Sequence, residues 1–344
     1  MFDDGGILVK TPYPFSFKPL RQQGFTLIEL MVALALGLLI TAAAVQLFTG
    51  GMLSSKMQEA NAELQNSGVF GLDYIARDLR LSNYSNINNP ALNEQTPWGG
   101  IVLTASSAAS ATNVNLPIPT VAPFISNGLL SHSVGTGEAV SSVKNEWRGI
   151  SNVDLQSDQL TIQFVAPNAM VNCEGDNVQE RDYVIQRYFL RPIDPDATTG
   201  TEYGLACDAN TPTPAGTAAV SRPTTITGFG GAGELIMPRV DHFTVQLGTR
   251  AANGNLAYYT INQYRVLAAA ARGGATPTEP PRIVSVKLAV LVRSTDNTRN
   301  SAIDPTQKIE ILNQNIELKD KTTKYARRVY STTVALRNGL GERI

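Results

Sequence analysis

Residues 21–36 read RQQGFTLIELMVALAL, and this stretch decides the organisation of the chain. From Leu30 to Ser55, 26 consecutive residues carry no formal charge, and most are Leu, Ala, Val, Ile, Met or Gly. About 20 apolar residues span a bilayer as a helix, so this run is long enough for one crossing. The basic residues before it are Lys10, Lys18 and Arg21, so the positive-inside rule predicts that the first 24 residues stay in the cytoplasm. Everything from Lys56 onward is then exported.

Two simpler explanations of the apolar run account for less of the sequence. A secretory signal peptide has a short apolar core followed by a cleavage site, whereas this run is long and its polar junction lies on the N-terminal side. A generic membrane anchor fits the hydrophobicity but leaves Glu29 unexplained, because a charged side chain at the bilayer centre costs roughly 2.5 kcal/mol or more.

The residues around that glutamate carry a specific resemblance. Gly24-Phe25-Thr26-Leu27-Ile28-Glu29 resembles the type III signal of type IV pilins and type II secretion pseudopilins. The resemblance implies a leader over residues 1–24, cleavage by a prepilin peptidase after Gly24 and N-methylation of the new N-terminal Phe25. It also implies that Glu29 pairs with the terminal amine of a neighbouring subunit, which would stabilise the carboxylate in hydrocarbon. Pairing within one chain, about one helical turn apart, is the alternative.

A helical pattern continues beyond the apolar run. No proline occurs from Phe25 to Asn89, and apolar residues recur every three or four positions from Met57 to Leu79. This predicts a helix from Thr26 to about Asn83, with residues 25–55 in the membrane and residues 56–84 packed on a globular head instead of a partner coiled coil. The intervening polar residues, Asp78 included, are assigned to the exposed face, and Arg77 and Asp78 to a solvated or head-packing pair. The glycines that could bend this helix are Gly37, Gly50, Gly51, Gly68 and Gly71.

The pattern changes after the helix. Residues 85–150 are rich in Asn, Ser, Ala, Pro and Gly, which predicts an irregular region. Residues 151–344 contain period-two patterns that predict strands at 160–165, 183–190, 242–247, 284–292 and 330–336. A half-buried sheet must cover its apolar face. The predicted fold class is therefore α+β, with a long N-terminal transmembrane pilin helix followed by a β-sheet-rich periplasmic head.

The helix and the head resemble one family within the pilin group. Residues 64–80 are similar to the corresponding stretch of PilW minor pilins, which also resemble the J-type pseudopilins of type II secretion. The segments SDQLTIQF, VDHFTVQLG, RIVSVKLAVLVRS and VYSTTVALRN follow in the order found in PilW-like proteins. The similarity covers both ends of the chain and several points between them, but not residues 90–150.

Cys173 and Cys207 are the only cysteines, and they flank the strand predicted at 183–190. An exported domain meets an oxidising compartment, so an even pair predicts a disulfide. Two buried thiols without a bond are the alternative. By the loop-entropy argument, a bridge across this segment stabilises the head by about 3–4 kcal/mol.

Composition argues against several function classes. The net charge is -1, which leaves no basic footprint, so no nucleic-acid partner is predicted. Two cysteines and two histidines offer almost no material for a metal site, and neither a metal nor another cofactor is predicted. Asp194 and Asp196 begin a calcium-loop pattern that lacks its glycine and its final carboxylate.

One motif suggests a nucleotide but fails on its context. Gly228-Phe229-Gly230-Gly231-Ala232-Gly233 matches a dinucleotide-binding pattern that must be followed by a helix. Pro238 prevents that helix, so a turn is predicted here. His132 and His242 lie far apart in sequence, and no G-x-S-x-G elbow supports a hydrolase. The chain is therefore predicted not to be an enzyme.

The family resemblance implies a minor type IV pilin of the PilW type. Such a protein is a prepilin with one inner-membrane crossing and a periplasmic head, which enters a surface pilus and primes or caps its assembly near the tip. The implied partners are the prepilin peptidase, other minor pilins, the major pilin and a tip adhesin. The alternatives are a J-type pseudopilin of a type II secretion system and a membrane-anchored periplasmic enzyme.

Overall fold

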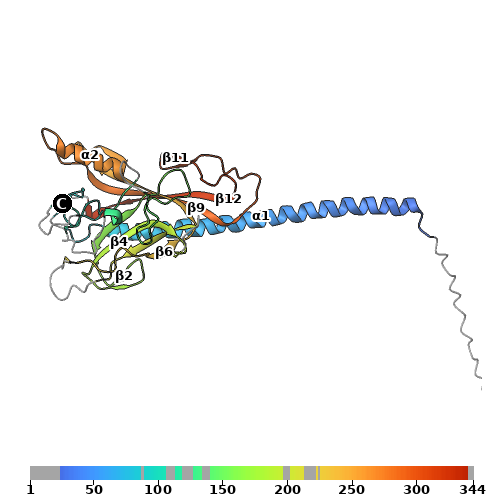
Figure 1. The fold of residues 1–344 in the computed structure, drawn as a ribbon, viewed down its shortest axis with the longest axis horizontal. Helices are drawn as coiled ribbons and strands as arrows, with labels where there is room; N and C mark the ends of the chain where they lie inside the picture. The colour runs from blue at the N-terminus through green and yellow to red at the C-terminus, as the bar shows by residue number, and fades with distance from the viewer. Residues whose placement is uncertain are drawn as a thin grey trace, which may run out of the picture. The chain divides into compact units, whose positions relative to one another are not determined.

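The structure is a computed structural model that describes residues 24–86, 89–105, 113–117, 127–133, 140–196, 202–212, 222–223 and 225–339. The chain divides into two compact units, Met1–Met52 and Leu53–Ile344. Of the predicted leader, only Gly24 lies within the described residues. Figure 1 labels the main helices and strands.

One long helix, α1, runs over Leu27–Leu81, close to the predicted limits (Figure 1). Its side chains are exposed through residue 56, and among the described helices it alone is long and apolar enough to cross a membrane, with a mean hydropathy of 2.4. The hydroxyls of Thr41 and Thr49 donate to the carbonyls of Gly37 and Val45, each at 2.9 Å. Such internal bonds satisfy polar groups where no water is available.

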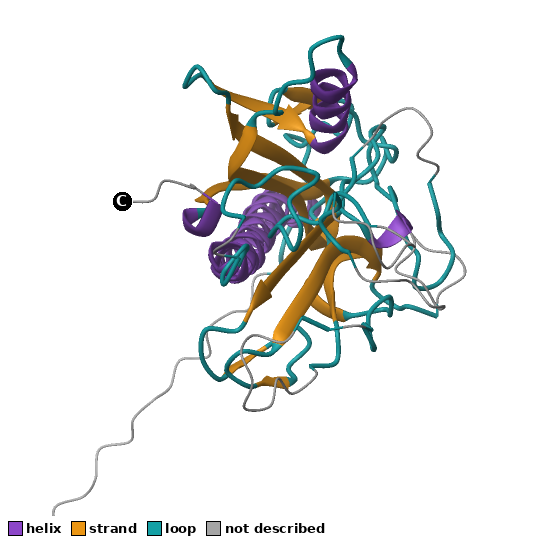
Figure 2. Cartoon of the chain, turned by 90° about the vertical axis from the view of Figure 1, so that its left-hand side faces the viewer, coloured by secondary structure: helices purple, strands orange, loops and turns teal. Residues whose placement is uncertain are grey.

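The second half of α1 belongs to the larger unit and packs between two sheets (Figure 2). A Cβ atom on Gly68 would lie 2.2 Å from the ring of Tyr330, and one on Gly71 would lie 2.2 Å from the methyl of Met237. These glycines therefore allow α1 to approach a strand on either side, and the helix continues through both. Leu64, Leu72, Ile75 and Leu79 are buried in the same core cluster as the strands.

Each of the two main sheets has four strands, and all neighbours pair antiparallel. The first has the order β1 (Leu160–Val165), β4 (Tyr183–Pro192), β5 (Tyr203–Ala209) and β6 (Glu234–Met237). The second has the order β12 (Tyr325–Ala335), β9 (Arg282–Asn297), β7 (Val240–Arg250) and β8 (Leu256–Thr260). All five predicted strands are present, and the predicted fold class is confirmed.

Smaller elements complete the head. Two short hairpins join β2 (Met170–Val171) to β3 (Asn177–Val178) and β10 (Ile309–Ile311) to β11 (Gln314–Ile316). A second helix, α2 (Ile261–Gly273), begins at Thr260, whose side chain accepts from the backbone of Gln263 in a capping box. Two single turns, η1 (Asn127–Leu129) and η2 (Arg337–Gly339), are the remaining named elements. In the described parts of 85–150, only η1 and isolated bridges occur.

The C-terminal end of α1 is held by the far end of the chain. Asn338 donates its side-chain amide to the carbonyls of Arg80 and Ser82, each at 3.2 Å. Asn83 in turn donates to the carbonyl of Asn338 at 2.7 Å and takes a left-handed φ of 64°. The last carbonyls of a helix have no partner within it, so Asn338 acts as the cap of α1.

Candidate functional site

The segment that carries the predicted processing site is open to solvent in the single chain. Gly24, Phe25 and Thr26 precede α1, and the Phe25 side chain is 83% exposed. The Thr26 hydroxyl accepts the N–H of Glu29 at 3.3 Å, which satisfies one of the unpaired donors of the first turn. Glu29 itself is exposed, and no described residue forms an ion pair with it. Its carboxylate is therefore available to a cation on another chain.

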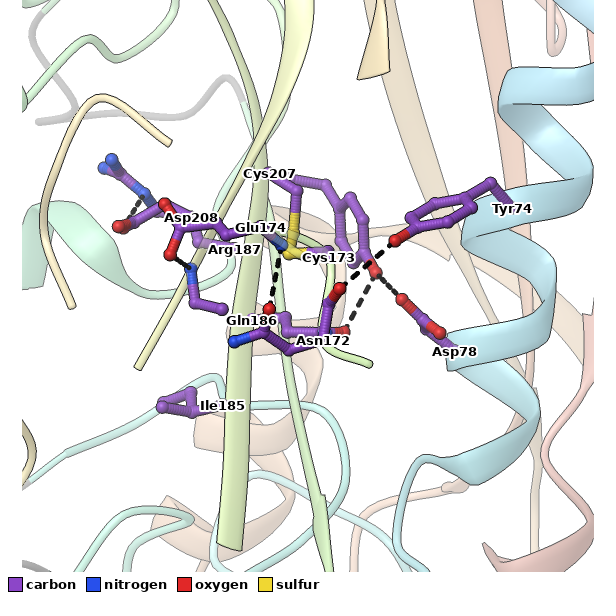
Figure 3. The surroundings of a disulfide bond; sticks show 12 residues. Tyr74, Asp78, Asn172, Cys173, Glu174, Ile185, Gln186, Arg187, Cys207 and Asp208 are labelled. Carbon is purple, nitrogen blue, oxygen red and sulfur yellow. Dashed lines mark hydrogen bonds and ion pairs between the residues drawn. A yellow bond between two sulfur atoms is a disulfide. The ribbon is translucent and has the colours of Figure 1, made fainter. Parts of the chain in front are cut away.

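The opposite end of the helix is fixed in the head by a buried polar cluster (Figure 3). Asp78 of α1 accepts a hydrogen bond from the hydroxyl of Tyr188 in β4 at 2.6 Å. The Gln186 amide is satisfied when its nitrogen donates to Asp78 and its oxygen accepts from the N–H of Cys173, each at 3.0 Å. Tyr74, one turn earlier on α1, donates to the carbonyl of Asn172 at 3.4 Å. The cluster joins α1 to β4 and to the segment beside the disulfide.

The structure forms the predicted disulfide between Cys173 and Cys207, whose Cα atoms are 6.0 Å apart. Cys207 lies in β5 directly opposite Tyr188, so the bridge and the Asp78 contact occupy one level of the sheet. Glu174, which follows Cys173 in the chain, accepts the N–H of Ala209 at 3.1 Å. Burial, together with nearby carboxylates, raises the pKa of Glu174 to about 7. The disulfide therefore positions the segment that contacts α1.

Asp78 should make the stability of the head depend on pH. Burial raises its pKa to about 6, although the bond from Tyr188 opposes the shift. The folded state then holds the proton more tightly than the unfolded state, so stability is greatest below about pH 4 and falls as pH rises to about 6. The loss amounts to at most about 3 kcal/mol, and the bond from Gln186 reduces it.

Urea unfolding of the full chain in detergent, between pH 4 and 8, measures this effect. Asp78→Asn should remove the part of the pH dependence that belongs to this window. Asp73→Asn, on the exposed face of the same helix, is the matched control and should leave the wild-type curve unchanged. Identical pH curves for wild type and Asp78→Asn would contradict the assignment.

A buried ion pair lies on the opposite face of β4 and β5 from Tyr188 and Cys207. Arg187 of β4 and Asp208 of β5 form an ion pair at 3.3 Å with both side chains fully buried. Asp208 also accepts the N–H groups of Gly230 and Gly231, each at 2.9 Å. The glycine-rich segment 228–233 is therefore a loop that wraps a buried carboxylate of its own chain, which explains the motif without a nucleotide.

The sequence interpretation of Arg77 and Asp78 was wrong in one respect. The two residues do not pair, because neighbours on a helix point about 100° apart. Arg77 binds the exposed Asp73 at 2.9 Å, whereas Asp78 is buried against β4. A signal for this burial was present, since Asp78 follows Gly71 by seven positions and Ile75 by three and so lies beside the apolar stripe.

The two histidines and the Asp194–Asp196 pattern are the other candidates that the sequence offered. His132 and His242 are both buried, and burial lowers the pKa of each to about 4. Their imidazoles are therefore neutral at pH 7. Asp196 pairs with Lys144, and no group of three or more metal-ligating side chains occurs in the part of the chain that the structure describes.

Two family models match the chain, one at its N-terminal segment and one in the C-terminal part of the head. Residues 19–45 match the family described as Prokaryotic N-terminal methylation motif. Residues 202–338, which include β5 to β12, match the family described as Type IV Pilus-assembly protein W. Together the two matches support a PilW-type minor type IV pilin.

Other comparisons are more distant. Among solved structures, the type IV-like pilin TTHA1219 from Thermus thermophilus is 13% identical to this chain. The similarity covers 80% of this chain and 96% of that chain, with a TM-score of 0.36. No curated protein sequence matches the chain.

The two family matches give the features described above a coarse function. They support a type IV pilin-like minor pilus subunit, and the methylation motif implies processing by a prepilin peptidase. The match to the pilus-assembly family supports a structural role in the pilus. The apolar half of α1 is consistent with anchorage of this PilW-type chain in a membrane.

Proposed function

We infer that this PilW-type chain is cleaved after Gly24, methylated at Phe25 and inserted once in the inner membrane, with its head in the periplasm. It then joins a pilus near the tip, where it primes or caps assembly with other minor pilins, the major pilin and a tip adhesin. The observation that carries this proposal is the exposed Glu29 at the start of an apolar helix, directly after the Gly24-Phe25 junction. A carboxylate there needs a cation, and cleavage creates one at Phe25.

The division of the chain follows from the same proposal. Residues 1–24 act as a cytoplasmic leader, residues 25–55 cross the membrane, and residues 56–84 connect that crossing to the head. The polar cluster around Asp78 and the ion pair between Glu63 and Arg239 both fix this connecting half in the head. The irregular region 85–150 follows this half, and the β-rich head, residues 151–344, then presents its outer surfaces to other subunits.

Processing can be tested on the protein in its own membrane. Mass spectrometry should find a chain that starts at N-methyl-Phe25. Gly24→Ala should still be cleaved substantially, whereas Gly24→Trp should accumulate as precursor, because the peptidase requires a small residue before the bond. Cells without the prepilin peptidase supply the uncleaved reference. An intact N-terminus in cells with an active peptidase would contradict the proposal.

The location of the processed chain separates a pilus subunit from a secretion pseudopilin. Recovery of the chain from fibres sheared off the cell surface is expected for a minor pilin. Retention in the envelope, together with loss of protein secretion when the gene is deleted, would instead support the J-type pseudopilin.

A further inference from the structure

The first turn of α1 shows which residue begins the helix. The carbonyl of Thr26 accepts the N–H of Leu30 at 3.2 Å, and the Thr26 hydroxyl accepts the N–H of Glu29 at 3.3 Å. A residue that accepts the first bond of a helix with its carbonyl and a second bond with its side chain is an N-cap. Thr26 is therefore the N-cap of α1, and Gly24 and Phe25 precede the helix.

This start leaves the Gly24 carbonyl outside the helix. Within an α-helix that carbonyl would accept the N–H of Ile28, four positions further on. The bond does not form, and no described residue donates to the Gly24 carbonyl. A Cβ atom on Gly24 would meet no described atom within 4 Å, and the Phe25 side chain is 83% exposed. The peptide bond that is proposed to be cut therefore lies in an open, non-helical segment.

Gly24 can begin the helix in place of Thr26, because glycine and threonine are about equally favourable N-caps. A helix that starts at Gly24 joins the Gly24 carbonyl to the N–H of Ile28 and includes Phe25 in its first turn. The carbonyl carbon of Gly24 is the atom that a peptidase must attack, and a helical turn withholds it from the enzyme. The choice between the two starts therefore decides whether the cleavage site is accessible.

The hydroxyl of Thr26 favours the later start. It is the side-chain group that accepts the N–H of Glu29. Without such an acceptor, an N-cap at position 26 becomes about fivefold less favourable, whereas Gly24 is unchanged as a cap. The hydroxyl thus acts against extension of the helix toward the leader.

We propose that Thr26 is a positioning residue for removal of the leader: its hydroxyl holds the start of α1 at residue 26 and so keeps the Gly24 carbonyl free for the prepilin peptidase. This step rests on the proposed function, because it concerns the same cleavage. Thr26 acts through the backbone N–H of Glu29 and not through contact with the reacting atoms. The backbone of Glu29 then serves cleavage, while its carboxylate remains available for assembly.

Pulse–chase labelling of the full chain, in cells with an active peptidase, measures the rate of leader removal. Thr26→Val keeps the shape of the side chain but has no oxygen acceptor, so it should be cleaved more slowly, by up to about fivefold. Thr26→Ser restores a favourable N-cap and should restore the rate. Thr41→Val is the matched control, because the Thr41 hydroxyl also bonds the backbone of α1, at Gly37, but far from the cleavage site. It should be cleaved like wild type.

A second measurement separates positioning from direct recognition of the hydroxyl by the peptidase. The chain contains two Gly-Phe pairs, Gly24-Phe25 and Gly228-Phe229. Labelling glycine carbonyls with ¹³C and phenylalanine nitrogens with ¹⁵N therefore gives two correlated NMR signals from uncleaved chain, purified in detergent from cells without the peptidase. The Gly24 carbonyl signal should move toward its helical value in Thr26→Val but not in Thr26→Ser. The Gly228 signal should stay fixed and serves as the internal reference.

Three outcomes would overturn the role of Thr26. They are equal cleavage rates for wild type and Thr26→Val, a Thr26→Ser chain as slow as Thr26→Val, and slow cleavage of Thr26→Val with an unchanged Gly24 carbonyl signal. The last result would mean that the peptidase reads the hydroxyl directly. Failure of the wild-type chain to be cleaved after Gly24 would instead contradict the proposed function, so the two failures are distinguishable.

Discussion

The Glu29→Val chain should be cleaved after Gly24 and inserted in the membrane normally, yet be nearly absent from assembled fibres. Valine removes the cost of a carboxylate in hydrocarbon, so insertion is maintained or improved. In the fibre, however, the amine of a neighbouring Phe25 loses its partner. Removing one member of a buried ion pair typically costs about 3–5 kcal/mol, which predicts at least a hundredfold loss of incorporation.

Sheared fibres and membranes from the same cells give the ratio of incorporated to inserted chain. Gln46→Leu is the matched control, because it also removes a polar group from the apolar part of α1 but lies far from the processing site. It should incorporate like wild type. If Glu29 only paired with the amine of its own chain, Glu29→Val would assemble normally, and that result would exclude the intersubunit role.

The second large effect should come from the disulfide. Replacing both Cys173 and Cys207 by serine should lower the free energy of unfolding of the head by about 3 kcal/mol, since the unfolded chain is no longer constrained. The loss should exceed that of Asp78→Asn, because the bridge also positions the Cys173 N–H that orients Gln186. Urea unfolding of the full chain in detergent gives both values.

Two further measurements make the disulfide prediction specific. Protein isolated from an oxidising compartment should not react with a thiol reagent until it is both unfolded and reduced, because Cys207 is fully buried. Cleavage after Gly24 and membrane insertion should be unchanged in the double variant, since both depend on the N-terminal segment. Rapid alkylation of two thiols without reductant would show that the bond does not form in cells.

The parts of this fold that the sequence predicted are those with long, regular patterns. An uncharged run of 26 residues followed by a stripe at helical spacing defines α1, and strict alternation defines β9 and β7. The strands β5 and β6 were missed, since the first contains Gly204 and small residues and the second ends after four residues at Pro238. The helix α2 was missed as well, because only three of its side chains are buried and its pattern is weak.

The residues of the candidate site likewise divide into those that the sequence predicted and those whose role only the structure shows. Gly24, Phe25 and Glu29 are recognisable because their relation is one of spacing along the chain. The role of Asp78 depends on Tyr188 and Gln186, which lie more than a hundred positions away, and no local pattern pairs a helix residue with a particular strand residue. The place of β8 at the end of its sheet was equally hidden, since it follows from the order of the strands in the sheet.

The cap that Asn338 places on α1 has a consequence for biogenesis. In the proposed export, the helix crosses the membrane first and its cap last, after every strand of both sheets. The apolar stripe around Gly68 and Gly71 lacks Met237 until β6 has crossed and lacks Tyr330 until β12 has crossed. Exposed surface of this kind is prone to aggregate. Contacts between the two ends of a chain also form slowly, because a long loop must close first. The head should therefore complete its folding late, and in the proposed periplasmic location the partly folded head is the form that chaperones would have to protect.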